Sequence, residues 1–90
     1  MPTIQFTTAL QRFFPTLEAQ EVSAGTVAEI LDQAEHLYPG IKEYIVDEQG
    51  RLRKHVNIFL SGELIKDKET LQDEVGEKDE VYIFQALSGG

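Results

Sequence analysis

The residues with the clearest chemical potential lie at the C-terminal end of the chain. The sequence finishes Leu87-Ser88-Gly89-Gly90, and this segment follows closely on the apolar run Val81–Phe84. Glycine has no Cβ, so a terminus of this kind can pass through a channel where the backbone is approached closely. Residues 87–90 can extend over roughly 13 Å. We therefore expect them to form a flexible tail that reaches from a docked domain into the active site of another protein.

The reactive group of such a tail is the carboxyl group of Gly90. A C-terminal carboxyl ordinarily has a pKa of about 3.3–3.7, so at neutral pH it is a carboxylate and a poor electrophile. Activation with ATP, for example to an acyl-adenylate, would make it reactive. A sulfur donor that displaced AMP would leave a thiocarboxylate, whereas an amine would give an amide. Nothing in the chain is arranged to catalyse either step, so the catalyst is expected to be another protein.

The remaining side chains form no recognisable catalytic group. The absence of cysteine excludes a cysteine nucleophile, a thiolate zinc site and a disulfide scaffold. His36 and His55 have no acidic residue or histidine at metal-ligand spacing, so we expect no metal site. The carboxylates gather in turn-rich stretches, where a solvated acidic surface explains them better than paired acid–base catalysis. We expect the chain not to be an enzyme and to bind no cofactor of its own.

The charge of the chain narrows the classes of partner. Asp and Glu number 16 against 8 Lys and Arg, which gives a net charge of −8. Nucleic-acid binding needs cations that displace counterions from phosphate, so neither DNA nor RNA is an expected partner. The same charge disfavours an anionic membrane surface, and no apolar run approaches the roughly 20 residues that span a bilayer. One small basic cluster, Arg51, Arg53, Lys54 and His55, is most simply a soluble strand edge.

The tail needs a rigid domain behind it, and we expect residues 1–86 to form a single domain in the cytoplasm, since no signal peptide is visible. Thr26 and Glu29 have the spacing of a capping box. Apolar residues then recur at intervals of three and four, which predicts a helix that ends before Pro39. The apolar stripe consists of Val27, Ile30, Leu31, Ala34, Leu37 and Tyr38.

Alternation of polar and apolar residues predicts the strands on either side of this helix. The first two are expected to form a hairpin around a loop, Leu10–Pro15, with partly buried phenylalanines. Ser61-Gly62 predicts a tight turn, and Asp47–Gly50 predicts another within a polar stretch. The expected strands are Thr3–Thr7, Leu17–Val22, Val56–Leu60, Glu63–Ile65 and Val81–Phe84.

This order of elements predicts an α+β protein with the β-grasp fold, in which one main helix packs on a mixed sheet of about five strands. Phe59, Tyr82 and Phe84 would lie on the sheet face away from the helix. Aromatic residues on an uncovered face often mark a contact site. The alternative is that Phe59 and Phe84 are covered by the loop Leu10–Pro15 or by the segment Ile41–Arg53.

Several segments together resemble the ubiquitin-like sulfur-carrier proteins of the MoaD/ThiS type. They occur in the expected order and span most of the chain, although each alone would be weak. The matching segments are Thr26–Leu31, Tyr38–Ile41, Val56–Glu63, Asp79–Phe84 and Ala86–Gly90.

This resemblance implies a ubiquitin-like fold and a Gly90 that is adenylated and then converted to a thiocarboxylate. A ThiF/MoeB-like adenylyltransferase would be the partner, and that enzyme would hold ATP and magnesium. A sulfur donor and a downstream sulfur-accepting synthase are implied as well. Gly89 and Gly90 match the family's tail, which Leu87 and Ser88 precede. Phe59, Tyr82 and Phe84 fall on strands that the family uses for docking.

The pathway stays open at this point. The segment Asp47–Ile58 looks most like carriers of cysteine, methionine or sulfur-containing siderophore biosynthesis, some of which work with a zinc-dependent JAMM-type peptidase. The small subunit of molybdopterin synthase is the main rival. Two further functions are compatible with the same sequence: a protein modifier conjugated to lysines, and a plain interaction domain with inert glycines.

Overall fold

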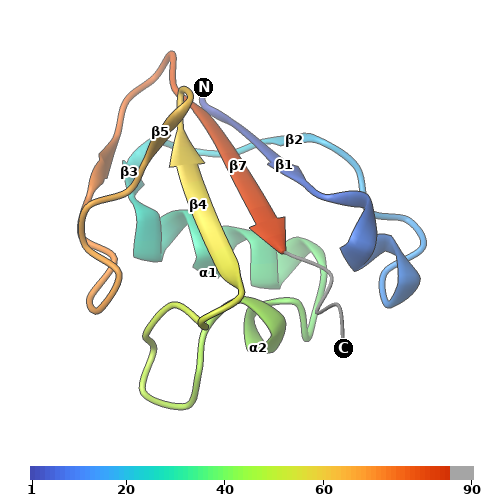
Figure 1. Cartoon of the computed structure of the whole chain (residues 1–90). Helices are drawn as coiled ribbons and strands as arrows, with labels where there is room; N and C mark the ends of the chain where they lie inside the picture. The colour runs from blue at the N-terminus through green and yellow to red at the C-terminus, as the bar shows by residue number, and fades with distance from the viewer. Residues whose placement is uncertain (86–90) are drawn as a thin grey trace.

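The computed structural model describes residues 1–85 of the 90-residue chain. These residues form short strands, one 3-10 helix and two α-helices (Figure 1). The elements are β1 (Thr3–Phe6), η1 (Thr8–Arg12), β2 (Gln20–Glu21), β3 (Gly25–Thr26), α1 (Val27–Leu37), α2 (Lys42–Ile45), β4 (Val56–Leu60), β5 (Glu63–Leu64), β6 (Glu74–Val75) and β7 (Glu80–Gln85).

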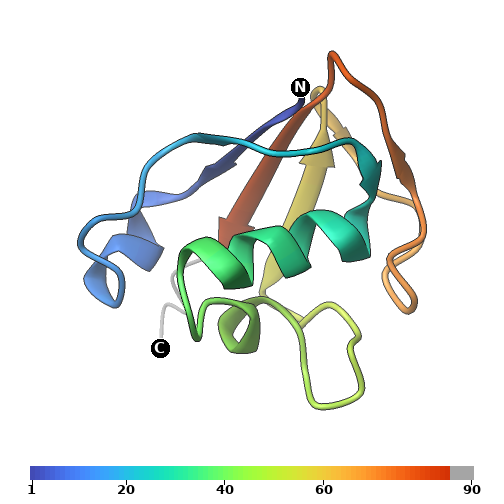
Figure 2. The same cartoon turned by 180° about the vertical axis from the view of Figure 1, so that it is seen from behind.

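The main sheet has the strand order β2-β1-β7-β4-β5. β1 and β7 run parallel, while the other neighbours are antiparallel, so the sheet is mixed. Figure 2 shows α1 lying across one face of this sheet, and no helix crosses the face that is toward the viewer in Figure 1. The prediction of a β-grasp fold with five strands and one main helix is confirmed. Because β7 is the central strand, its last residue, Gln85, lies in the middle of the sheet.

The core lies between α1 and the sheet. Ile30, Leu31 and Ala34 of α1 are fully buried, and Ile58 and Ile83 face them as a cross-strand pair. Thr26 caps the helix as predicted: its Oγ1 accepts from the Glu29 amide, and the Glu29 carboxylate accepts from the Thr26 amide. Leu37, in contrast, is 48% exposed. At about 100° per residue it lies some 80° from the centre of the stripe, at the edge of the buried face.

Two local predictions were wrong, and one short helix was not predicted. The loop Leu10–Pro15 overlaps the 3-10 helix η1. The expected strand Leu17–Val22 shrinks to two residues, because the Glu18 amide donates to the Tyr38 hydroxyl (3.2 Å) instead of to a neighbouring strand. The polar stretch after Gly40 contains α2, whose start is fixed by the Glu35 carboxylate as it accepts from the amides of Gly40 and Lys42.

The sequence also gave no sign of β3 and β6, which pair with each other outside the main sheet. Each has two residues, so neither has room for an alternating pattern. The turn at Ser61-Gly62 is confirmed, with φ values of 47° and 89° that suit a two-residue hairpin.

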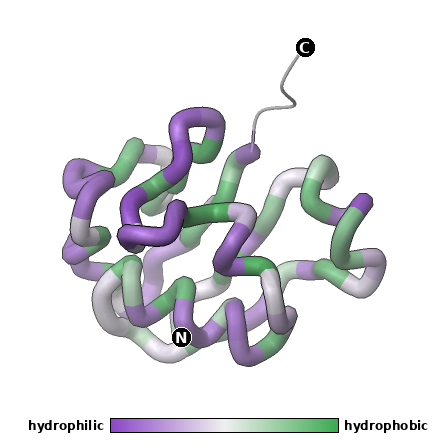
Figure 3. The backbone as a smooth tube through the Cα atoms, turned by 90° about the horizontal axis from the view of Figure 1, so that it is seen from below, coloured by the Kyte–Doolittle hydropathy of each residue, from purple (hydrophilic) through white to green (hydrophobic). Residues whose placement is uncertain are grey.

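Hydrophobic and hydrophilic residues alternate along the backbone, as expected for elements with one buried face and one exposed face (Figure 3). Within residues 1–85, no helix combines the length and the hydrophobicity that a membrane crossing requires.

Candidate functional site

The last described residue before the predicted tail is Gln85, which ends β7. The predicted reactive residue Gly90 and the tail residues Leu87, Ser88 and Gly89 lie outside the described residues, so the predictions for them stay predictions. What the structure describes is the base from which the tail departs and the two surfaces beside it.

Thr7 fixes the direction of the chain at this base. Its amide donates to the Ile83 carbonyl (3.0 Å), and its Oγ1 accepts from the Gln85 amide (3.1 Å). Thr7 is a polar residue that is buried, with 8% of its surface exposed. Sequence reasoning missed it, because a threonine directly after a predicted strand has many ordinary uses. The link ties the end of β7 to the end of its parallel neighbour β1.

The first surface is the open face of the sheet, which we call the aromatic face: Phe59, Tyr82, Phe84 and Leu64. Phe59 lies opposite both Tyr82 and Leu64 in the strand register. Phe84 and Leu64 are 39% and 43% exposed, and the other two are half-buried. The predicted residues therefore share one face, and Leu64 extends it. The alternation of Leu64 with the buried Ile65 could have revealed that addition.

Neither segment that was considered as a cover lies over this face. Phe13 and Phe14 instead pack against Tyr44 of α2, with ring centroids at 4.8 and 5.5 Å. Ile41 and Ile45 are buried in the core on the helix side. The expectation of partly buried phenylalanines holds for Phe14, but Phe13 is 52% exposed.

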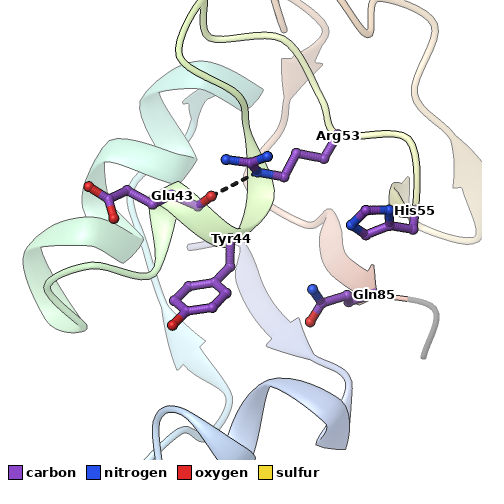
Figure 4. Close-up of a pocket in the computed structure, with 5 residues that line it drawn as sticks. All are labelled: Glu43, Tyr44, Arg53, His55 and Gln85. Atoms are coloured by element: carbon purple, nitrogen blue, oxygen red, sulfur yellow. Dashed lines mark hydrogen bonds between the residues drawn. The ribbon is translucent and has the colours of Figure 1, made fainter. Parts of the chain in front are cut away.

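The second surface is a hollow on the helix side of the tail base, shown in Figure 4. It is lined by Glu43, Tyr44, Arg53, His55 and Gln85. The Arg53 guanidinium donates through Nε to the Glu43 carbonyl (2.8 Å), which fastens the polar stretch to α2. The basic cluster was expected to be no more than a soluble strand edge. Arg51 fits this expectation, since it pairs with Asp47 at 3.4 Å, whereas Arg53 and His55 line the hollow at the tail base.

No catalytic grouping accompanies these surfaces in the described part of the chain. His36 is exposed on α1 and lines a different hollow from His55. Residues 1–85 hold no group of three His, Asp or Glu side chains that could bind a metal ion.

The carboxylates with shifted pKa values support the same conclusion. The backbone amide of Arg51 lowers the pKa of Asp47, and the amide of Gly76 lowers that of Asp79. Hydrogen bonds from the hydroxyl and the amide of Thr70 lower the pKa of Asp67 to about 2. A general acid would need a raised pKa, so these groups act as hydrogen-bond acceptors that shape loops.

The described residues present the end of a central strand between the aromatic face and the hollow that contains Arg53 and His55. The model of the ThiS family matches residues 4–90. The chain belongs to the ThiS family. This match includes the terminal residues that the structure does not describe.

Individual relatives agree with the family. The sulfur carrier protein CysO of Mycobacterium tuberculosis is 27% identical over 90 residues, which cover 98% of this chain and 97% of CysO. A chain in the crystal structure of the BexX/CysO complex of Amycolatopsis orientalis superimposes with a TM-score of 0.85 and 29% identity, over 100% of both chains. SAMP1 of Haloferax volcanii shares the fold with a TM-score of 0.77 and 22% identity, over 99% of this chain and 98% of SAMP1.

Proposed function

We propose that this protein is a sulfur carrier whose terminal Gly90 is adenylated by a ThiF/MoeB-like enzyme and then converted to a thiocarboxylate. The observation that carries the proposal is the match to the ThiS family through residue 90, the residue whose carboxyl group would react. The full-length similarity to CysO, a sulfur carrier by name, supports it.

The chemistry uses the backbone carboxylate and reagents supplied by the partner. A carboxylate oxygen of Gly90 attacks the α-phosphorus of ATP, and pyrophosphate leaves. Hydrosulfide, or a persulfide sulfur that a reductant later releases, then attacks the carbonyl carbon of the acyl-adenylate. The bond between that carbon and the AMP oxygen breaks, which leaves AMP and a thiocarboxylate. ATP and magnesium are held by the partner in this scheme.

The geometry of the described residues suits a carrier that docks first and reacts at a distance. The five residues after Gln85 can span about 16 Å when extended. The aromatic face includes Phe84, the residue before Gln85, and its exposed Phe84 and Leu64 side chains are suited to contact a partner. Phe59, Tyr82 and Phe84 would thus dock the protein while Gly90 enters the active site of the adenylyltransferase.

Because the segment Asp47–Ile58 resembles carriers of cysteine, methionine or thio-siderophore biosynthesis, we propose an acceptor of that type in preference to molybdopterin synthase, and CysO is a sulfur carrier by name. A downstream synthase would take the sulfur, and a JAMM-type peptidase would belong to the same pathway. One relative is known in a complex with a second protein, BexX, which fits a carrier that works by docking. The likeness to SAMP1, at 22% identity, concerns the fold and does not favour a modifier.

The test is a charging reaction with the ThiF/MoeB-like enzyme of the same organism, ATP, magnesium and sulfide, followed by the intact mass of the carrier. We expect the mass to rise by the difference between one sulfur and one oxygen, and a chain that lacks Gly90 to show no change. If the complete chain is never charged by any such enzyme, the proposal fails. Lysine conjugates in cells with no thiocarboxylate would support the modifier instead.

A further inference from the structure

Two hollows meet at the base of the tail, and both contain cationic side chains. Gln85 lines the hollow that holds Arg53 and His55. The same residue lines a second hollow together with Arg12 and Phe84. We call Arg12, Arg53 and His55 the basic collar, because they lie on different sides of the strand end. Arg12 comes from η1, while Arg53 and His55 precede β4.

The collar has no anionic partner among the described residues. The ion pairs of residues 1–85 join Met1 to Glu77, Lys42 to Asp32 and Arg51 to Asp47, and none includes a collar residue. Glu43 lines the hollow, but it accepts from Arg53 through its carbonyl. Figure 4 shows its carboxylate directed away from the Arg53 guanidinium. The positive charge at the tail base is therefore available to another molecule.

This arrangement is unusual for a chain of such acidity. The net charge is −8, and only 8 residues are Lys or Arg. Two of these, Arg12 and Arg53, stand at the one point of the domain from which the tail departs. A quarter of the Lys and Arg side chains therefore line the hollows at Gln85, although Arg53 also borders a neighbouring hollow that contains Glu35, Asp47 and Glu48.

The lining of the hollows argues against a small-molecule site. Such sites are mostly apolar and enclose their ligand. In the hollow of Figure 4, Tyr44 is the one large aromatic among the described lining residues, and the others are polar or charged. Side chains of a docked protein suit this surface better.

We propose that the basic collar docks against acidic residues around the mouth of the channel that receives the tail in the activating enzyme. This inference rests on the proposed function. Gly90 lies five residues beyond Gln85, which is about 16 Å of extended chain. The collar would therefore contact the entrance of the channel and not the site where the Gly90 carboxyl group reacts. The collar acts on association and orientation, since exposed charges at the rim of an interface chiefly set the association rate and its salt dependence.

The test compares two double variants with the same change of charge. Arg12→Gln with Arg53→Gln removes the collar cations, and Lys66→Gln with Lys68→Gln removes cations elsewhere. Lys66 and Lys68 are exposed and make no ion pair among the described residues. Association with the purified ThiF/MoeB-like enzyme is measured by stopped flow at low and high ionic strength, with the charging reaction as a second readout.

We expect the collar variant to associate about tenfold more slowly at low ionic strength, and the difference to shrink as salt is added. The lysine control should stay close to the wild type. Arg12→Lys with Arg53→Lys should retain most of the rate, which separates charge from loss of the Arg53–Glu43 hydrogen bond. Thermal unfolding establishes that each variant is folded.

Equal rates for the collar variant and the lysine control would overturn the inference while leaving the proposed function intact, provided that the wild type is still charged. Slower association at every salt concentration, with no rescue by lysine, would also overturn it, because the arginines would then act through shape. If the wild type itself is not charged, the proposed function fails and the inference falls with it.

Discussion

The N-terminus of helix α1 and the base of the tail, which lies toward the other end of this helix, differ in how their exposed groups are paired (Figure 1). At its N-terminus, polar groups of the chain satisfy one another. The amides of Val27 and Ala28 donate to the carbonyls of Asp73 and Leu71, each at 2.9 Å, while Thr26 and Glu29 form the capping box. Leu71 accepts a φ of 57° in order to place its carbonyl there.

The loop of residues 66–73, which contacts this N-terminus, uses its carboxylates in the same way. Asp73 accepts from the amides of Lys66 and Asp67 at 2.9 and 2.8 Å. Asp67 accepts from the amides of Glu69, Thr70 and Gln72 and from the Thr70 hydroxyl. Acidic side chains in this region thus have structural partners within the chain.

At the tail base, several exposed groups have fewer such partners among the described residues. Phe84 is exposed, Phe13 is exposed and stacked on Tyr44, and the Arg12 guanidinium pairs with no carboxylate of residues 1–85, while Arg53 donates to the Glu43 carbonyl and to no carboxylate. The contrast indicates that polar groups paired within the chain stabilise the fold, whereas exposed side chains at the tail base form the surface that contacts other proteins. Substitutions at the two ends should therefore separate stability from activity.

The largest effect is expected at the aromatic face. Phe84→Glu places a charge where the partner should bury an aromatic ring, and a residue central to an interface contributes about 2 kcal/mol or more. The charging efficiency should fall by roughly 30-fold, with little change in the unfolding temperature. Leu37→Glu is the matched control, since Leu37 is also exposed but lies on α1. Equal losses for both variants would remove the distinction between the two surfaces.

The opposite pattern is expected at the N-terminus of α1. Thr26→Ala removes the hydroxyl that accepts from Glu29, and loss of such a cap costs about 1 kcal/mol. For a domain of this size the unfolding temperature should fall by roughly 4–8 °C. Charging at a temperature where the variant is folded should be unchanged. A charging defect in the folded variant would show that the capping box serves more than the fold.

Thr7 is buried and also holds the end of β7 at the tail base, so its replacement should slightly lower both the stability of the fold and the rate of charging. Thr7→Val keeps the shape but loses the acceptor for the Gln85 amide, which should cost about 0.5–1 kcal/mol. Charging should slow a few-fold, because the tail base is less well oriented. Thr7→Ser retains the hydroxyl and should restore charging. Valine and serine variants that charge equally well would refute this positioning role.

The smallest effect on charging is expected from Asp67, because its hydrogen bonds contribute to stability, and that contribution is present at neutral pH and lost in acid. Its folded pKa is about 2, below the ordinary value of 3.8 that applies when unfolded. The stabilisation is therefore complete above about pH 4 and is lost as the pH falls toward 2. Asp67→Asn should unfold more readily than the wild type near neutral pH, and the difference should diminish in that acidic window. A difference that is constant from pH 6 to about pH 2 would contradict the assignment.

Sequence reasoning reached the fold because its decisive signals are local. The capping box at Thr26, the stripe of α1 and the alternation in β4 and β7 each depend on neighbours a few residues apart. The pairing of β3 with β6 joins residues some 50 positions apart through two residues each, and no local pattern predicts it.

In the candidate site, too, some residues could be predicted from local patterns and others depend on the tertiary structure. Phe59, Tyr82 and Phe84 could be placed on one face from strand alternation alone. The meeting of Arg12 and Arg53 at Gln85 depends on how η1 and the segment before β4 fold around the end of β7. The role of Thr7 depends on the parallel pairing of β1 with β7, which is a property of the tertiary structure.

The central claim is that the domain carries sulfur on its own C-terminal carboxyl group. The most direct measurement charges the protein with its activating enzyme, ATP and sulfide, cleaves it after Lys78 with trypsin, and locates the added sulfur by tandem mass spectrometry. We predict that the sulfur is found on the peptide of residues 79–90, at Gly90 alone. An unchanged terminal peptide under conditions in which a known carrier of the ThiS family is charged would contradict the claim.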